Sequence, residues 1–216
     1  MTSIKIFVEG GGATNASGQA ELRVAFDTLL KAQKEAARKR RVTWTTVFCG
    51  GRGEAVNEFA KAVKRADAEF VVLVVDAEDP VASKVEDHPT PEERVRHLEV
   101  RDGWAEKLRG GAPDCVHLMT RCIEAWLVAD GEKVAGYYGQ HFHGNALPKR
   151  RILDGEEKAA VYGALERATK DTKKGSYGKI KHASALLKLV RPDVVAERCV
   201  SFQQLTMWLE ATIAGA

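Results

Sequence analysis

The hydrophobic positions change their spacing several times along the chain, and each change marks a secondary-structure element. Short apolar or alternating runs predict strands at residues 4–8, 42–49, 70–75 and 115–119. The third run reads Phe-Val-Val-Leu-Val-Val and contains no polar position, which is typical of a strand buried on both faces. Apolar residues three and four apart predict helices at residues 19–40, 54–65, 91–108 and 121–130.

Strands that alternate with helices predict an α/β fold, with a mostly parallel central sheet and helices on both of its faces. The pattern changes near residue 136, where strand signals stop and helical segments follow at 155–169, 179–190 and 202–213. We therefore predict an α/β core over residues 1–135. A helical C-terminal extension over residues 136–216 is expected to pack on it.

Composition narrows the class of protein without indicating a function. Of the 216 residues, 44% are hydrophobic and 29% are charged, which is ordinary for a globular chain. No apolar run approaches the ~18 residues of a membrane span, and the first residues do not have the pattern of a secretory signal. The four cysteines lack metal-site spacing and are expected to be free thiols. These features predict a cytoplasmic protein, and the net charge of +3 permits nucleic-acid binding without arguing for it.

Acidic residues follow the predicted strands at the points where the strands end. Glu9 comes directly after the first strand, Asp76 and Glu78 follow the third, and Glu124 lies about one helical turn after the fourth. Ligands of parallel α/β sheets bind outside the carboxyl ends of the strands, so these side chains are expected at one edge. Two carboxylates 4 Å apart repel by roughly 4 kcal/mol at an effective dielectric constant near 20, which favours a bound cation. Hard oxygen ligands suit Mg²⁺ or Mn²⁺.

The same acidic residues also have interpretations that need no metal. Carboxylates after strands often cap helices or form turns, and Asp79, which precedes Pro80, fits a turn better than a ligand set. A carboxylate in the first turn of a helix, such as Glu124, also interacts favourably with the helix dipole.

A basic segment near residue 177 offers a second candidate surface. Lys174, Lys179 and Lys181 lie around Tyr177. They form either a solvated loop or a nucleic-acid contact in which lysines bind phosphates and Tyr177 stacks on a base. If the C-terminal part folds over the sheet, Lys179 can stabilise charge that develops on a phosphate during cleavage.

Several short motifs in order along the chain carry a family resemblance. The chain resembles the bacterial domain-of-unknown-function family 4276, whose members are regarded as Toprim-like. The matching segments are Val8-Glu9-Gly10, residues 73–80 (Leu-Val-Val-Asp-Ala-Glu-Asp-Pro), residues 101–104 (Arg-Asp-Gly-Trp), Leu118-Met119, residues 124–130 (Glu-Ala-Trp-Leu-Val-Ala-Asp) and residues 175–179 (Gly-Ser-Tyr-Gly-Lys).

The resemblance implies a metal site and a class of chemistry. Toprim domains carry a glutamate after the first strand and an Asp-x-Asp pair after a later one, and they bind Mg²⁺. They act in topoisomerases, primases and nucleases of the overcoming-lysogenisation-defect type, and related proteins occur beside ATPases in anti-phage defence. Glu9 matches the glutamate, and Asp76-Ala-Glu78 stands at the pair, with a longer side chain in the second place that moves the ligand.

The sequence therefore predicts a metal-dependent phosphodiesterase that acts on DNA or RNA. Glu9, Asp76 and Glu78 are expected to hold the metal, Glu124 to serve as a ligand or general base, and Lys179 to stabilise charge. Two other functions stay open. One is a non-catalytic subunit that binds a partner ATPase, and the other is a nucleotidyl-transfer enzyme that uses the same metals.

Overall fold

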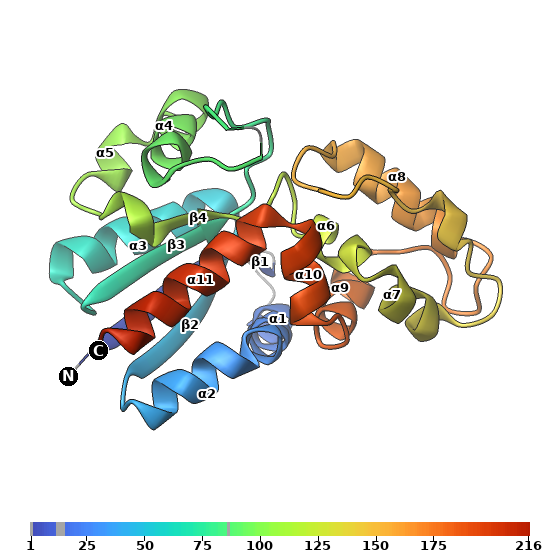
Figure 1. The fold of residues 1–216 in the computed structure, drawn as a ribbon, viewed down its shortest axis with the longest axis horizontal. Coiled ribbons are helices and arrows are strands. Elements are labelled where there is room, and N and C mark those ends of the chain that lie inside the picture. The colour runs from blue at the N-terminus through green and yellow to red at the C-terminus, as the bar shows by residue number, and fades with distance from the viewer. Residues whose placement is uncertain (1, 12–15, 86) are drawn as a thin grey trace.

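The central sheet contains four parallel strands in the part of the chain that the computed structural model describes, residues 2–11, 16–85 and 87–216. The strands β1 (Ser3–Gly11), β2 (Thr43–Gly50), β3 (Phe70–Val75) and β4 (Val116–Leu118) lie in the order β2-β1-β3-β4 (Figure 1). Helices follow the strands along the chain, as the alternating pattern predicts. The expected α/β fold with a parallel sheet is confirmed.

The two faces of β3 pack against different sets of helices. Leu73 and Val75 belong to a buried cluster with α3 (Arg52–Arg65) and α4 (Pro91–Asp102). Val72 and Val74 belong to a larger cluster on the other face, which includes side chains of α1 (Ala16–Leu29) and α11 (Val200–Ala214). From Val71 to Val75 no residue is more than 8% exposed, so the continuous apolar run is buried on both faces, as predicted.

Two long predicted helices are interrupted in the structure. The segment 19–40 forms α1 and then α2 (Lys31–Lys39), separated at Leu30. The segment 91–108 forms α4 and a short α5 (Ala105–Leu108), because Gly103 takes a left-handed conformation (φ 69°) that ends α4. The start of α4 agrees with its sequence, since Thr90 and Glu93 form a capping box and Pro91 occupies the first helical position between them.

The elements around β4 are shorter than predicted. A 3₁₀ helix, η1 (Pro113–Cys115), precedes the strand, so Cys115 lies in a turn rather than in the sheet. Proline supplies no main-chain N–H and its φ suits the start of such a turn. The following helix, α6 (Glu124–Ala129), begins three residues later than expected.

The C-terminal part contains more helical segments than the sequence predicts. They are α7 (Gly131–Tyr138), the 3₁₀ helix η2 (Gly144–Ala146), α8 (Lys158–Thr169), α9 (Lys179–Leu187), α10 (Pro192–Arg198) and α11. The boundary expected at residue 135 falls inside α7, and the division into two parts stays a prediction. None of the helices in the described residues is long and apolar enough to cross a membrane.

A buried histidine on β4 leads to a prediction about acid stability. His117 is 1% exposed and packs against the ring of Trp208, with the ring centres 5.4 Å apart. Burial lowers the pKa of His117 to about 3, and the charge of Arg94 contributes. In the unfolded chain the pKa is about 6.5. As the pH falls from about 6.5 towards 3, only the unfolded state gains this proton, so the folded state loses stability by up to about 1.4 kcal/mol per pH unit.

Urea denaturation of the His117→Gln variant at pH 7, 5 and 4 measures this contribution. Relative to the wild type, the variant is expected to lose less of its free energy of unfolding as the pH falls. His88→Gln is the control, because His88 is exposed. A parallel decline in wild type and His117→Gln would contradict the assignment of this acid sensitivity to His117.

Candidate metal centre

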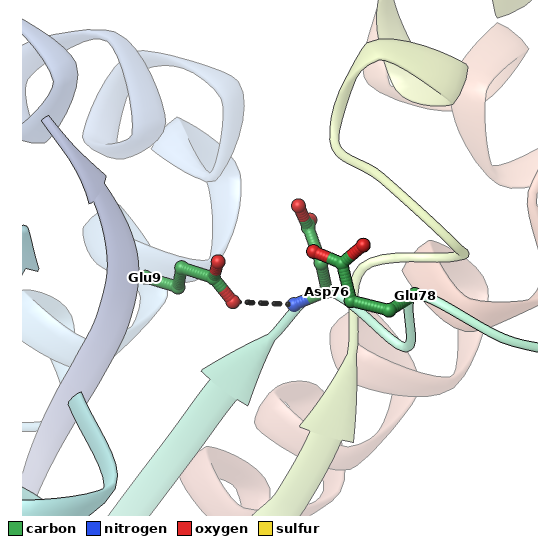
Figure 2. A group of neighbouring side chains, drawn as sticks. All are labelled: Glu9, Asp76 and Glu78. Atoms are coloured by element: carbon green, nitrogen blue, oxygen red, sulfur yellow. Dashed lines mark hydrogen bonds between the residues drawn. The ribbon is translucent and has the colours of Figure 1, made fainter. Parts of the chain in front are cut away.

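Three carboxylates meet where β1 and β3 end. Val8 lies opposite Val74 in the register of these strands, which delivers Glu9 beside the end of β3. One oxygen each from Glu9, Asp76 and Glu78 lie within 4.8 Å of one another. Figure 2 shows Glu9 reaching from β1 towards Asp76 and Glu78, which follow β3, and the main-chain N–H of Asp76 donates to Oε2 of Glu9 (3.1 Å). We call these three residues the acidic triad.

The main-chain conformation after β3 places the side chains of Asp76 and Glu78 on the same side of this segment (Figure 2). Ala77, between them, is buried in the core cluster beside α3 and α4, and its N–H donates to the carbonyl of Thr120 (2.7 Å). Glu78 has a left-handed backbone (φ 63°), and its N–H donates to the carbonyl of Arg121 (3.2 Å). Left-handed conformations are unfavourable for residues with a Cβ and persist where the surrounding structure enforces them.

The electrostatic environment of Asp76 is unfavourable for a negative charge. Asp76 is 2% exposed, and burial is the main cause that raises the pKa of its carboxyl to about 8. The charges of Glu9 and Glu124 contribute to this rise, while Lys179 and Lys158 oppose it. Burial also raises the pKa of Glu9, against the charge of Arg52 and the hydrogen bond from Asp76. The acidic triad therefore requires positive charge nearby.

Two basic side chains that the sequence analysis missed supply part of that charge. The Nζ atom of Lys158, at the start of α8, lies 2.6 Å from Oε1 of Glu78 and 3.8 Å from Oδ2 of Asp76. The Nη1 atom of Arg52, at the start of α3, lies 3.5 Å from Oε2 of Glu9 and donates to the main-chain carbonyl of Asp76.

Arg52 is held in place by two residues of the segment at 101–104, one of the segments that carry the family resemblance. Its Nη2 atom lies 2.6 Å from Oδ2 of Asp102, and its guanidinium lies 4.8 Å from the ring centre of Trp104. Both residues belong to the Arg-Asp-Gly-Trp segment at 101–104. The motif could have indicated a buried basic partner, because a carboxylate and an aromatic ring together favour arginine.

Glu124 lies beside the acidic triad in a network of its own. It is fully buried, and its Oε1 accepts hydrogen bonds from the hydroxyls of Tyr162 (2.7 Å) and Tyr177 (3.1 Å). The Nζ atom of Lys179 is 3.6 Å from the same oxygen, whereas Oε2 of Glu124 has no hydrogen-bond partner among the described residues. Burial acts to lower the pKa of Lys179, but the carboxylates of Glu124, Asp76 and Glu9 outweigh it and raise the pKa.

A protein-family model matches residues 8–210 of the chain. The chain belongs to the family described as Domain of unknown function (DUF4276). The comparisons with curated proteins and with solved structures gave no match. The DUF4276 match includes the acidic triad, both basic partners and the Glu124 network, so these residues all belong to the family domain.

The basic segment of this DUF4276 chain is divided between its interior and its surface. Lys174 and Lys181 are exposed; Nζ of Lys174 lies 4.9 Å from the ring centre of Tyr137, and Nζ of Lys181 donates to the carbonyl of Lys174. Lys179 turns inward to Glu124. Tyr177 is 6% exposed and its hydroxyl is bonded to Glu124, so its buried ring does not fit the base-stacking role predicted for it. A phosphate-binding role of the lysines stays a prediction.

Proposed function

We propose that this DUF4276 chain is a metal-dependent phosphodiesterase that acts on nucleic acid through a Toprim-like site. The observation that carries the proposal is the acidic triad at the ends of two neighbouring parallel strands, with Asp76 buried. A glutamate near the end of β1, two residues before its last residue, and an Asp-x-Glu pair after β3 resemble the Toprim pattern, which supports the same chemistry. Action beside a partner ATPase in anti-phage defence is part of the proposal.

The donor set of the acidic triad fits Mg²⁺ or Mn²⁺. Oxygens bound to one such ion at about 2.1 Å lie up to about 4.2 Å apart, so small rotations of side chains now within 4.8 Å suffice. Three clustered carboxylates, one of them with a pKa raised to about 8, also favour a divalent cation. When bound, such an ion polarises a phosphoryl oxygen and lowers the pKa of a coordinated water.

The chain's own residues have separable roles in this proposal. Glu9, Asp76 and Glu78 hold the ion, and Lys179 places a positive charge beside the site to stabilise charge on the phosphate. Glu124 positions Lys179 through Oε1 and offers Oε2, which has no partner among the described residues, as a proton acceptor or ligand.

One observation favours the second candidate function, a non-catalytic subunit that binds a partner ATPase. Lys158 and Arg52 already provide counter-charges for the acidic triad, and Lys158 contacts two of its members. A site neutralised in this way can be maintained for structural reasons alone.

Cleavage assays separate the two candidates. The purified chain, with and without the product of any ATPase gene found beside its own, is incubated with plasmid DNA, single-stranded oligonucleotides and tRNA in Mg²⁺, Mn²⁺ or EDTA. We expect cleavage that requires the divalent ion. Stable association with the ATPase, without cleavage under any of these conditions, would favour the non-catalytic subunit.

Replacing Lys158 tests whether its ammonium competes with a metal. Without a divalent ion, Lys158→Met is expected to lower the free energy of unfolding by about 1 kcal/mol, because Glu78 and Asp76 lose a partly exposed counter-charge. In Mg²⁺ the melting temperature of the variant should rise by more than that of the wild type, because the cation no longer displaces the ammonium. Thermal melts with and without Mg²⁺ measure both effects. Lys158→Arg is the charge-preserving control, and a smaller Mg²⁺ response in Lys158→Met would exclude the competition.

A further inference from the structure

A cavity of about 590 Å³ borders the segment that carries Asp76 and Glu78. Ala77 and Asp79 line it, whereas members of the acidic triad do not. Its other walls come from the loop between β3 and α4, from Arg94 on α4, from the segment after β4, from the loop before α8 and from the start of α11. The cavity is therefore separate from the acidic triad but shares a short stretch of main chain with it.

Four basic side chains line this cavity: Lys84, Arg94, Arg121 and Arg150. Arg94 is 5% exposed, and its guanidinium donates to neutral oxygens, namely the carbonyls of Val116 (2.7 Å) and Pro89 (3.3 Å) and Oε1 of Gln204 (3.1 Å). Among the described residues no carboxylate lies within ion-pair distance of it. A buried arginine without an ion pair leaves positive charge on the wall, which the carboxylates of Asp114 and Glu92, beyond ion-pair distance, only partly offset.

Arg121 adds an unused hydrogen-bond donor. Its Nε atom is buried and has no hydrogen-bond partner in the part of the chain that the structure describes. The main chain at this position is held, because the carbonyl of Arg121 accepts from the N–H of Glu78 (3.2 Å). Buried donors are nearly always paired in native proteins, so a ligand that supplies an acceptor here accounts for the arrangement.

The acidic residues of the cavity wall are largely engaged elsewhere. Asp79 lies 2.6 Å from Nε of Arg101, outside the cavity wall. The two carboxylate oxygens of Asp154 accept from the N–H groups of Val200 (2.7 Å) and Ser201 (3.0 Å) at the start of α11. Asp87 is the remaining acidic residue of the wall in the part of the chain that the structure describes. Among the described residues, four basic groups therefore line the wall beside one carboxylate that is not held by another partner. One of the four, Arg150, pairs at 3.8 Å with Glu156 outside the wall.

We propose that this cavity binds a phosphomonoester, either a free nucleotide or the phosphorylated end of a nucleic-acid strand. Arginine guanidinium groups match phosphate oxygens in geometry and charge, and the volume lies in the range of small-ligand pockets. The cavity requires no metal, so this binding is independent of the phosphodiesterase proposed for the acidic triad.

Calorimetric titration in EDTA tests the proposal with inorganic phosphate, a nucleoside 5′-monophosphate and an oligonucleotide. The oligonucleotide is prepared in two forms of the same sequence, one with a 5′-phosphate and one with a 5′-hydroxyl. The wild type is expected to bind phosphomonoesters. Arg121→Met should weaken this binding by about 10- to 100-fold, as loss of a charged hydrogen bond predicts. The variant without ligand should melt no lower than wild type, since Nε of Arg121 loses no partner. Arg109→Gln is the control, because Arg109 is exposed and lies outside the cavity.

The ligand series identifies the source of the phosphate. Tighter binding of the mononucleotide than of the oligonucleotides indicates a free nucleotide, and a preference for the 5′-phosphorylated over the 5′-hydroxyl strand indicates a nucleic-acid end. If Arg121→Met does not fold, Arg150→Gln serves instead and should weaken binding several-fold. Absence of binding to every probe, or equal binding by Arg121→Met and wild type, overturns the proposal. Asp76→Asn should keep this binding in EDTA, so failure here and failure of the metal site are distinguishable.

Discussion

Asp76→Asn is expected to abolish Mg²⁺-dependent cleavage and the Mg²⁺-dependent rise in melting temperature, while the metal-free variant melts no lower than wild type. Oδ1 of Asp76 accepts a hydrogen bond from the N–H of Ile123 (3.0 Å), just before α6. Asparagine keeps this acceptor and removes the ionisable carboxyl, whose charged form Glu9 and Glu124 repel. The metal loses a direct ligand, and cleavage should fall at least about 100-fold.

Asp76→Ala is the matched comparison. It removes the charge and also the acceptor of the Ile123 N–H, so it should be less stable than Asp76→Asn by about 1 kcal/mol. Thermal melts in EDTA and in Mg²⁺, beside cleavage assays, measure the two variants. If Asp76→Asn cleaves like wild type, or if Mg²⁺ still raises its melting temperature by as much, the acidic triad is not the metal site.

Glu124→Ala is expected to cause the largest loss of stability, about 3–5 kcal/mol in the free energy of unfolding. The carboxylate is fully buried, and its removal leaves Lys179 without its nearest counter-charge and two tyrosine hydroxyls without their acceptor. Each hydroxyl left without its acceptor costs about 1–3 kcal/mol, whereas the side chain of Lys179 is 37% exposed and its charge keeps access to water.

Urea denaturation in EDTA measures this loss, and Glu124→Gln separates charge from hydrogen bonding. Glutamine keeps an oxygen for the hydroxyls of Tyr162 and Tyr177, so its loss should be smaller than that of alanine. Glu106→Ala is the control, because Glu106 is exposed and pairs with Arg109 on the surface, where such pairs contribute at most about 1 kcal/mol. Wild-type stability in Glu124→Ala would mean that Lys179 does not depend on this carboxylate.

The position of the acidic triad could be predicted from the sequence because a parallel sheet brings strand ends together. The uninterrupted apolar run identified β3. The carboxyl-terminal ends of β1 and β3 then placed Glu9, Asp76 and Glu78 at the same edge of the sheet. The prediction required only the order of strands and helices, and no knowledge of how distant side chains pack.

The partners of the acidic triad could not be predicted in this way. Lys158 lies 80 residues beyond Glu78, in a helix whose position depends on how the C-terminal part folds back. Nothing in the local sequence distinguishes it from other lysines. Tyr177 stands among lysines and glycines and therefore resembles a loop residue, but its ring is buried because its hydroxyl reaches Glu124.

The interruptions of the helices were also only partly predictable from the local sequence. Gly103 gave a local signal for the end of α4, since glycine readily takes the left-handed conformation found there. The break at Leu30 between α1 and α2 has no glycine or proline, so residues 19–40 look like one helix. Leu30 is fully buried in the larger core cluster, and packing rather than sequence pattern determines where the helices separate.

The hydrogen bond between Asp76 and the start of α6 has a consequence for how this chain can diverge. In the proposed function the side chain of Asp76 supplies a metal ligand, and in the fold it supplies a hydrogen-bond acceptor. If that proposal holds, a descendant that no longer needs catalysis loses the first requirement and keeps the second. Asparagine satisfies folding alone, and a single nucleotide change converts an aspartate codon into an asparagine codon. Asparagine at position 76 is thus the change by which inactive descendants of this chain should be recognised.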